Sequence, residues 1–495
     1  MRRAWLALAV LLIAGCGSTV PKAGTQASAS RAGSESQLGG ASDLGETTIP
    51  SSGDTGTGTG TGKVGSPQTA SRTAGTVGGT KSGGAASVAT KAVSGQAISV
   101  GILAEDFDSS AAAFAVKDSG QGDQQAQAQA VINYINGHGG AAGRQLVPVF
   151  HHNDPSSGTF TQQNQASCSA FTEDHKVFVV TPQNFEMDSL IACLAKKGVP
   201  LIATDHVFGA WSDQTQLDQY ADYLYLPGTM NFTRSGTVID GLAADGYFGA
   251  KPKIGLLYLD SPSITRAVEK ATKPALAAHG LQLTDAVKIS SPTSETDVSN
   301  DAAQAANAVL RFRSENIDHV LFLEGAGEIP FLFMPQADAQ GYHPRYGLSS
   351  YDQPAWLTEN APLSQLPGAL AMGWIPTLDV GETQDPHNNA AAALCLQIMK
   401  AAGQNVTVDR SHQHSAFGFC SSLFFIQAAL NAAPTVDVKG LRAGVESLGS
   451  TFTSALTLAT LFRPGRHDGA SMIAPLAFDG GCSCFKYTAA PRSAP

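Results

Sequence analysis

Apolar residues recur along this chain with two different periods. Residues 97–103 form a short strand pattern, whereas Ala128, Val131, Ile132 and Ile135 recur at the spacing of one helix face. The same alternation continues to about residue 348. We predict, in chain order, strand 97–103, helix 126–136, strand 146–150, helix 162–172, strand 176–181, helix 187–197, strands 199–203 and 223–226, helix 233–248, strand 253–259, helix 263–279, strand 283–289, helix 300–314, strand 319–323, helix 330–340 and strand 345–348. Strands that alternate with helices predict parallel sheets covered on both faces, and two runs of domain length predict two α/β lobes.

A glycine-rich segment, GHGGAA at residues 137–142, fits the G-x-G-x-x-A pattern of a dinucleotide-binding turn. In such a turn the glycines follow a strand and open a helix, so that backbone amides meet the pyrophosphate. Here a predicted helix precedes the glycines and a predicted strand follows them. We therefore expect Gly137 to cap the helix in the left-handed conformation, and Gly139-Gly140 to form a tight turn into the strand. No cofactor is expected.

The first fifteen residues have the order of a secretory signal peptide. Arg2 and Arg3 are followed by an apolar stretch at residues 4–14 that is too short to span a bilayer. The stretch ends in IAGC at residues 13–16, which resembles the bacterial lipobox. We predict that Cys16 is lipidated and that the chain is exported and anchored by lipid to the outer face of the cell membrane. The alternative is an ordinary cleaved signal with an incidental cysteine.

Residues 16–97 have a different composition from the rest of the chain. They are rich in Gly, Ser, Thr and Ala, include TGTGTGTG at residues 55–62, and contain no aromatic residue. Such a segment cannot bury enough apolar surface to offset its ordering entropy. We expect a flexible tether of roughly 80 residues, with a random-coil end-to-end distance of about 50 Å. The folded body then occupies about residues 98–488, a length that suits two lobes.

Charge and motifs exclude several classes of function. The formal net charge is −10 with 15% charged residues, so the basic face that a nucleic-acid-binding protein needs is missing. No G-x-S-x-G, H-E-x-x-H or Walker loop occurs, so no catalytic set is present and we expect no enzyme. Strand alternation sends His151 and His152 to opposite faces, and the motif His412-Gln413-His414 has no carboxylate or cysteine at ligand spacing. We therefore expect no metal site.

Six cysteines besides Cys16 form an even set in a chain with an export signal, which favours disulfides. Two pairs, Cys168 with Cys193 and Cys395 with Cys420, are each 25 residues apart. Closing a loop of that size stabilises a fold by roughly 3.5 kcal/mol in the chain-entropy model. These pairings are the best of the fifteen possible, which the sequence alone does not decide between. Cys482 and Cys484 remain to pair with each other; a metal pair or a redox couple is the alternative.

The segment AVINYINGHGGAAGRQL, residues 130–146, resembles the helix–turn–strand of type I periplasmic binding proteins of the branched-chain amino-acid (Leu/Ile/Val) group. Asn153-Asp154-Pro155 fits the same pattern, as does the cysteine pair on the following helix and its neighbour. Weaker similarity continues, in the right order, through KVFVVTPQN, KKGVPLIATD, YLYLPGTMNFTRSG, KIGLLYLDS and HVLFLEGAGEIPFLFMPQADAQGYHP.

The resemblance implies two Rossmann-like lobes, joined by three crossings, that close on a small solute. It places the first lobe at 98–227 plus about 347–450, and the second at 228–346 plus about 451–488. In the family the solute is normally delivered to a membrane ABC permease, and a lipid-anchored tether suits that task. The expected protein is a monomer without a cofactor. The alternative from another class is a ligand-sensing protein on the same fold that signals through a membrane partner.

Ligands of open α/β sheets bind beyond the carboxyl ends of the strands. Glu324 is the best candidate for an acid that holds an ammonium group, since an opposite charge compensates its desolvation. A salt bridge or a helix N-cap is the alternative role for Glu324, and turn or capping chemistry is the alternative for the other residues. The candidates in the first lobe and the second lobe are Glu105, Asp106, Gln183, Asn184, Thr204, Asp205, Ser261, Glu324 and Tyr351.

Two loops depart from the amino-acid-binding members of the family. Those proteins usually carry a Ser/Thr-Gly turn after the first strand and a Gly-x-x-Ser-type turn after the third, where this chain has EDFDSS and TPQN. Acidic and amide groups would reshape a carboxylate pocket. The resemblance therefore leaves an amide-bearing, cationic or hydroxylated solute as open as a free branched-chain amino acid.

Overall fold

The computed structural model describes residues 95–105, 120–154, 156–182, 188–203, 212–325, 327–386, 389–407 and 410–494. The predicted signal peptide, Cys16 and nearly all of the predicted tether lie outside the described residues.

The first sheet has five parallel strands in the order β2-β1-β3-β4-β5. Its central strand carries apolar residues on both faces, with Val100 and Ile102 in one core and Leu103 in another. Gly101 lies where a Cβ atom would come within 2.8 Å of the Phe171 ring, so only glycine allows this close helix packing. The strands are β1 (Ile98–Glu105), β2 (Leu146–Asn153), β3 (Val179–Pro182), β4 (Leu201–Ile202) and β5 (Leu224–Tyr225).

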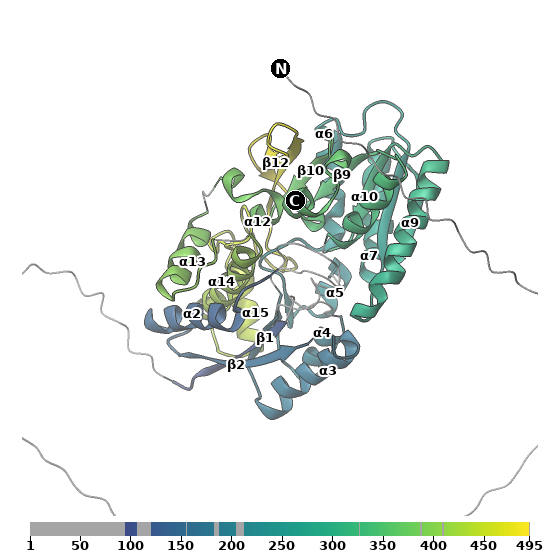
Figure 1. Ribbon diagram of the computed structural model, residues 1–495. Helices are drawn as coiled ribbons and strands as arrows, with labels where there is room; N and C mark the ends of the chain where they lie inside the picture. Colours follow the sequence, from purple (N-terminus) through teal and green to yellow (C-terminus); the bar gives the residue numbers. More distant parts are fainter. Residues whose placement is uncertain are drawn as a thin grey trace, which may run out of the picture. The chain divides into compact units, whose positions relative to one another are not determined.

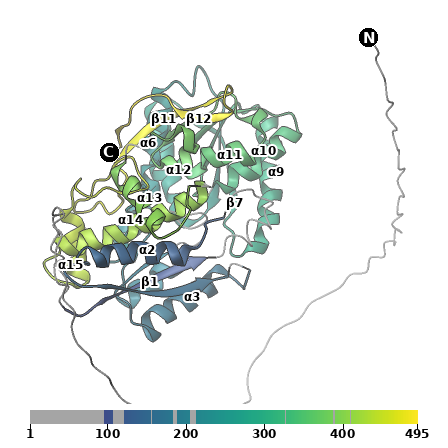
Figure 2. The same cartoon turned by 60° about the vertical axis from the view of Figure 1, so that its left-hand side comes forward.

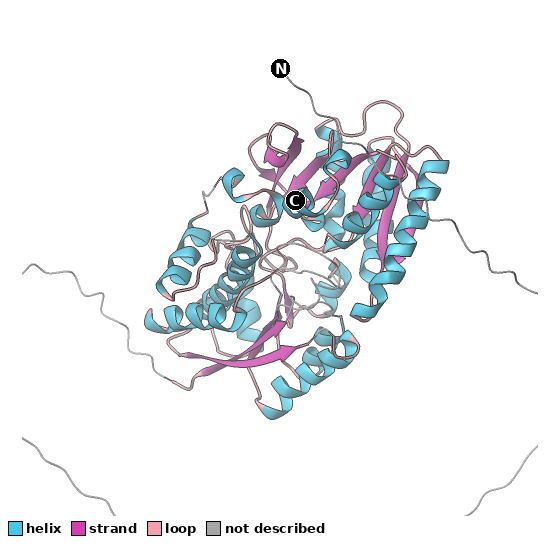
Figure 3. Cartoon of the chain, in the orientation of Figure 1, coloured by secondary structure: helices cyan, strands magenta, loops and turns pink. Residues whose placement is uncertain are grey.

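Helices cover both faces of this sheet (Figures 1 and 3). On one side α3 (Phe160–Ser169) packs against α4 (Asp188–Lys196), and Cys168 and Cys193 join them. On the other side α2 (Gln124–Gly137) lies beside α14 (Arg410–Ala432), as Figure 2 shows. The helices α13 (Ala390–Ala401) and α15 (Val438–Ser447) flank α14, and α5 (Gln214–Gln219) precedes β5.

The second sheet is mixed, with eight strands. A parallel group in the order β10-β9-β8-β6-β7 is extended at one edge by antiparallel strands near the C-terminus. The sequence pattern predicted the first four parallel strands and missed the rest. The strands are β6 (Ile254–Asp260), β7 (Leu283–Ser290), β8 (His319–Leu323), β9 (Arg345–Ser349), β10 (Leu370–Gly373), β11 (Met472–Asp479), β12 (Cys484–Tyr487) and β13 (Arg492–Ser493).

The helices around the second sheet follow the predicted pattern with one interruption. The expected helix 263–279 is divided into two α-helical parts by a π-helical turn at Val268–Thr272. The α-helices are α6 (Ser235–Ala244), α7 (Pro262–Ala267), α8 (Lys273–Ala278), α9 (Val298–Ser314), α10 (Glu328–Ala339), α11 (Pro354–Asn360) and α12 (Pro376–Asp379).

The predicted return to the first lobe near residue 347 differs from the sheet topology. Strand β10 still belongs to the second sheet, where it pairs with β9 and buries Ala371 and Met372. Only α13, which begins at Ala390, packs against the first-lobe helix α2. We define the first crossing as residues 226–231, the second crossing as 374–389 and the third crossing as 448–471. Extending the second sheet covers apolar residues that the lobe boundary drawn from the sequence would leave at an edge.

Helix α14 is long and apolar enough to cross a membrane by length and composition, but 72% of its most apolar window is buried inside the fold. A core helix of a globular lobe has these same properties. Its contacts with α2, α13 and α15 assign it to the core of the first lobe.

The glycine segment forms the predicted connection between helix and strand, with one correction. Gly139 and Gly140 have positive φ angles of 101° and 69°, as the tight turn requires. Gly137 is instead the last residue of α2, and His138 caps the helix with φ −111°. The prediction of a left-handed Gly137 is wrong because the chain reverses two residues later. A Cβ on Gly140 would lie 1.9 Å from the Arg144 carbonyl oxygen, so the close backbone approach is made there.

The three disulfides confirm the predicted pairings: Cys168–Cys193, Cys395–Cys420 and Cys482–Cys484. The first two join neighbouring helices, and the third closes a turn between β11 and β12.

Candidate ligand site at the carboxyl ends of the strands

Three predicted site residues follow neighbouring strands at one edge of the second sheet. In the parallel register Tyr258 of β6 lies beside Leu323, the last residue of β8. Ser261 and Glu324 therefore follow these strands at the same edge, and Tyr351 follows β9. This confirms that the sheet brings the three loops to one edge; it does not test whether they bind a solute.

The first-lobe candidates fall largely outside the described residues. Glu105 is the last residue of β1 and pairs with Asn153 at the end of β2, although its side chain is not described. The positions that lie outside the described residues are Asp106, Gln183, Asn184, Thr204 and Asp205.

Ser261 has a structural task in this fold. It is the N-cap of α7, and its hydroxyl accepts a hydrogen bond from the Ile264 amide at 3.2 Å. Its Oγ also lies 3.2 Å from the hydroxyl of Ser263. The side chain is 7% exposed, so it fixes the start of α7 at the sheet edge.

Glu324 is fully buried directly after β8. Its Oε1 accepts a 2.6 Å hydrogen bond from the amide of Gly327, the N-cap residue of α10. Gly327 has φ 73°, a left-handed conformation that glycine tolerates. The carboxylate thus lies at a helix N-terminus, where a negative charge is stabilised.

Tyr351 connects the first and second crossings. Its hydroxyl donates a hydrogen bond to the Met230 carbonyl oxygen, and its ring meets Trp374 edge-to-face at 4.7 Å between centroids. The Phe232 ring is 4.9 Å away on another side. Only 5% of Tyr351 is exposed, so its ring belongs to the packing between the crossings.

The sequence analysis missed a buried polar group that anchors the second crossing. Ser350 donates to Asp379 Oδ1 at 2.6 Å and accepts the Trp374 amide at 2.7 Å. Tyr487, on β12, donates to Asp379 Oδ2 at 2.7 Å. Burial of Asp379 raises the pKa of its carboxyl group to about 7, although hydrogen bonds from Ser350 and Tyr487 oppose that shift. No motif marks these residues, because their partners are distant in sequence.

The third crossing carries a buried ion pair. Arg234 donates to Asp468 at 2.8 Å and to the backbone carbonyl oxygens of Ala470 and Ala494. Nearby His467 is 2% exposed and lies 3.2 Å from Glu446 Oε1. Burial lowers the pKa of His467 despite that carboxylate, so the imidazole is held neutral. These contacts fix the chain where it passes between the sheets.

Two contacts join elements of the two lobes away from the crossings. Arg266 of α7 makes a two-point ion pair with Asp213, the N-cap of α5, at 2.6 and 2.9 Å. The amide of Phe160, at the start of α3, donates to the Thr293 carbonyl oxygen at 3.0 Å. Asp213 is 2% exposed, which strengthens its attraction to Arg266.

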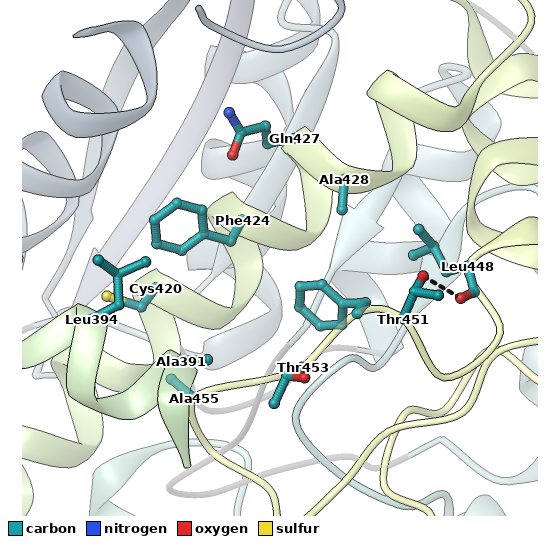
Figure 4. A pocket seen from close by; sticks show the side chains of 11 residues that line it. Ala391, Leu394, Cys420, Phe424, Gln427, Ala428, Leu448, Thr451, Thr453 and Ala455 are labelled. Atoms are coloured by element: carbon teal, nitrogen blue, oxygen red, sulfur yellow. Dashed lines mark hydrogen bonds between the residues drawn. The ribbon is translucent and has the colours of Figure 1, made fainter. Parts of the chain in front are cut away.

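Two cavities lie elsewhere in the fold. One, of about 270 Å³, lies between α13, α14 and residues 448–455, and is mostly apolar (Figure 4). The Thr451 hydroxyl at its rim donates to the Leu448 carbonyl oxygen. The other, of about 20 Å³, lies in the second lobe, has space for about one water molecule, and includes Tyr351 in its lining. None of the other predicted site residues lines either cavity.

The histidines of the sequence analysis have ordinary packing environments. The His151 ring meets the Phe171 ring at 5.8 Å, and burial lowers the pKa of His151. His414 is buried and its Nδ1 lies 2.6 Å from the Thr377 hydroxyl. Within the described part of the chain, no group of three or more His, Cys, Asp or Glu side chains could hold a metal ion.

Residues 97–478 match the sequence profile of a family described as periplasmic binding protein. The chain belongs to the periplasmic binding protein family. Its two-lobed α/β architecture is the type I fold of this family, and the family binds solutes rather than catalysing a reaction. Among curated proteins, none matches this chain in sequence.

Solved periplasmic binding proteins share the fold at low sequence identity. A branched-chain amino-acid ABC transporter protein from Thermus thermophilus with bound valine has a TM-score of 0.57 and 15% identity, covering 80% of this chain and 97% of its own. A solute-binding protein from R. palustris in complex with 4-hydroxybenzoate has a TM-score of 0.57 and 14% identity, covering 81% and 98%. An extracellular ligand-binding receptor from Verminephrobacter eiseniae has a TM-score of 0.56 and 13% identity, covering 79% and 100%.

Proposed function

We propose that this chain is an exported lipoprotein that captures a small polar solute between its lobes and delivers it to an ABC importer in the membrane. The family match over residues 97–478 carries the proposal. Lipid attachment at Cys16 and the tether at 16–97 would keep the binding lobes near the permease. The protein acts as a monomer and needs no cofactor.

An amino acid, an amide or a related compound is the proposed class of solute. The loops that follow the strands carry acids, amides and hydroxyls, namely Glu105, Asp106, Gln183, Asn184, Thr204, Asp205, Ser261, Glu324 and Tyr351. Similar folds hold valine in one protein and 4-hydroxybenzoate in another, so the fold accepts both an ammonium-bearing and a hydroxylated solute. The side chains of the loops therefore decide the solute.

A thermal-shift screen of the purified chain tests solute capture. Amino acids, amides, polyamines and short organic acids are each added in excess, and we expect one class to raise the melting temperature. A solute at 100 times its Kd stabilises the bound state by about 2.7 kcal/mol. If a broad screen at millimolar concentrations never raises the melting temperature, solute capture is rejected.

Glu324 is the residue whose charge we expect a cationic solute to need. The substitution Glu324→Gln keeps an oxygen that can accept the Gly327 amide but removes the charge. We expect affinity for an ammonium-bearing solute to fall roughly 10- to 100-fold, as loss of a charged hydrogen bond predicts. Titration calorimetry measures the change, with Glu359→Gln on the exposed surface of α11 as control. Equal affinities for Glu324→Gln and the control remove Glu324 from the site.

A ligand-sensing protein that signals through a membrane partner is the second candidate, favoured by similarity to the extracellular ligand-binding receptor. Genes for a permease and an ATPase beside the gene for this chain would support transport, whereas a gene for a sensor kinase would support sensing.

A further inference from the structure

The turn between β11 and β12 presents a disulfide to solvent. Cys482 and Cys484 are bonded across the single residue Ser483, which has φ 54°. Cys482 and Ser483 are exposed, and Cys484 is half-buried. In the other two disulfides, Cys168 and Cys395 are fully buried and Cys420 is 1% exposed. A thiolate in solution therefore reaches Cys482 far more readily than the two longer-range bonds.

Ring size separates the same three disulfides. Two of them close loops with a sequence separation of 25, whereas Cys482 and Cys484 are separated by 2. A disulfide gains stability over its reduced form partly because it restricts the unfolded chain, and this gain grows with loop length. The Cys482–Cys484 bond gains least from the fold, so it is the easiest of the three to reduce at equilibrium.

The strand that begins at this turn ends at the second crossing. Cys484 is the first residue of β12 and lies opposite Asp479 of β11, and Tyr487 is the last residue of β12. The Tyr487 hydroxyl donates to Asp379, a fully buried residue of the second crossing. Asp379 accepts a hydrogen bond from Ser350, whose Oγ accepts the Trp374 and Ile375 amides. The disulfide and the interlobe connection are thus four residues apart on one short strand.

We propose that Cys482–Cys484 is a thiol–disulfide exchange site for an extracytoplasmic dithiol, and that its redox state sets how firmly β12 supports the second crossing. A thiolate of the dithiol attacks the exposed Cys482 Sγ, forms a mixed disulfide and releases the Cys484 thiolate, which takes a proton. The second thiol of the dithiol loses its proton and attacks its partner sulfur, closes a cyclic disulfide and releases the Cys482 thiolate, which is protonated in turn. Two electrons pass from the dithiol to the protein. Reduction frees the turn, so that β12 and Tyr487 hold Asp379 less firmly.

Stepwise reduction of the full chain with dithiothreitol tests the exchange site. Free thiols are trapped with iodoacetamide at each dithiothreitol concentration, the rest are reduced and labelled with N-ethylmaleimide, and peptides are quantified by mass spectrometry. We expect Cys482 and Cys484 to react at about ten-fold less dithiothreitol than the other pairs, equivalent to about 30 mV for a two-electron couple. Simultaneous reduction of all three pairs, or earlier reduction of another pair, overturns the proposal.

Amide hydrogen exchange tests the link to the second crossing. After mild reduction we expect the Trp374 and Ile375 amides to exchange roughly three- to ten-fold faster, as expected for a weakened buried hydrogen-bond network. The double variant Cys482→Ser/Cys484→Ser and the single variant Tyr487→Phe should show the same acceleration without reductant. The amides of α3, held by the intact Cys168–Cys193 bond, are the internal control and should not change. Unchanged exchange at Trp374 and Ile375 in reduced protein overturns the link.

Discussion

At the scale of single residues, Asn136 explains why the glycine segment carries so much family information. The Asn136 amide nitrogen donates to the Leu146 carbonyl oxygen, and its amide oxygen accepts from the Leu146 amide, both at 2.8 Å. Asn136 therefore satisfies both backbone groups of Leu146, the first residue of β2, from the end of α2. A carboxylate or a methyl group would satisfy one of these groups or neither, so the position requires an amide side chain.

The substitution Asn136→Ala should destabilise the fold. It leaves the Leu146 amide and carbonyl groups without their side-chain partner, at a cost of about 1–3 kcal/mol in the free energy of unfolding. Urea unfolding monitored by circular dichroism measures the loss. Asn133→Ala, on the exposed face of the same helix, is the control, and equal losses for the two variants would contradict the assigned role.

Two buried acids in the second lobe make stability depend on pH. Glu328 of α10 is 3% exposed and Asp301 of α9 is fully buried. Among the described residues, Glu328 Oε1 and Asp301 Oδ2 have no hydrogen-bond partner. Burial raises the pKa of Glu328 to about 8, with a further contribution from Asp301, and burial raises the pKa of Asp301 to about 6. The folded chain therefore retains protons that the unfolded chain releases.

We expect the variant Glu328→Gln to remove part of this dependence. The folded pKa of Glu328 lies above its unfolded value, so the stabilisation is fully present below about pH 4.5 and is lost as the pH rises through about 8. The stability of Glu328→Gln relative to the natural chain should therefore rise between pH 5 and pH 8, by up to about 1.4 kcal/mol per pH unit. Urea unfolding at pH 5, 6.5 and 8 measures the difference. A constant difference across this range would show that Glu328 does not titrate in it, and Glu359→Gln is the exposed control.

At the scale of elements, short helices are joined by covalent bonds where their own packing is limited. Helices α3 and α4 contribute Cys168 and Cys193 to the smaller of the two hydrophobic cores. Helices α13 and α14 contribute Cys395 and Cys420 to the larger core. A helix of nine or ten residues, such as α4 or α3, is marginal without tertiary contacts, so the disulfide holds the pair against the sheet.

Removing the first disulfide should therefore cost more stability than removing the third. We expect Cys168→Ala/Cys193→Ala to lower the free energy of unfolding by about 3.5 kcal/mol, the chain-entropy value for its loop. Cys482→Ser/Cys484→Ser closes a far smaller loop and should cost much less. Chemical unfolding without reductant compares the two variants, and similar losses would show that loop length does not decide the contribution.

At the scale of the whole molecule, the two lobes are connected by three crossings and by contacts between their helices. Tyr351, Asp379 and Asp468 tie the crossings with buried hydrogen bonds. The ion pair of Arg266 with Asp213 joins α7 to α5 directly. Charges that pair between lobes favour the arrangement in which the lobes meet.

The variant Arg266→Gln should weaken that arrangement. It leaves Asp213 buried at 2% exposure without its cationic partner, a change that commonly costs about 3–5 kcal/mol for a fully buried pair and less here because Arg266 is partly exposed. We expect a larger radius of gyration by small-angle X-ray scattering and a faster dissociation of bound solute. Lys288→Gln, which removes an exposed ion pair with Asp260, is the control. An unchanged scattering curve would show that the pair does not favour closure.

The sequence by itself determined the α/β class, most helices and strands up to residue 349, the three disulfides and the family. These features depend on short-range periodicity, on cysteine spacing and on local turn chemistry, which neighbouring residues specify together. The carboxyl-end rule also placed Ser261, Glu324 and Tyr351 at one sheet edge, because parallel strands share a direction.

Only the tertiary structure decided the late strands β10–β13, the position of the second crossing, and the left-handed glycines of the turn. It also revealed Ser350, Asp379 and Tyr487 as one group, and the pairing of Arg266 with Asp213. Each of these features joins residues that are distant in the chain and leave no periodic signal. Their energies come from burial and from hydrogen bonds that exist only after the two sheets have formed.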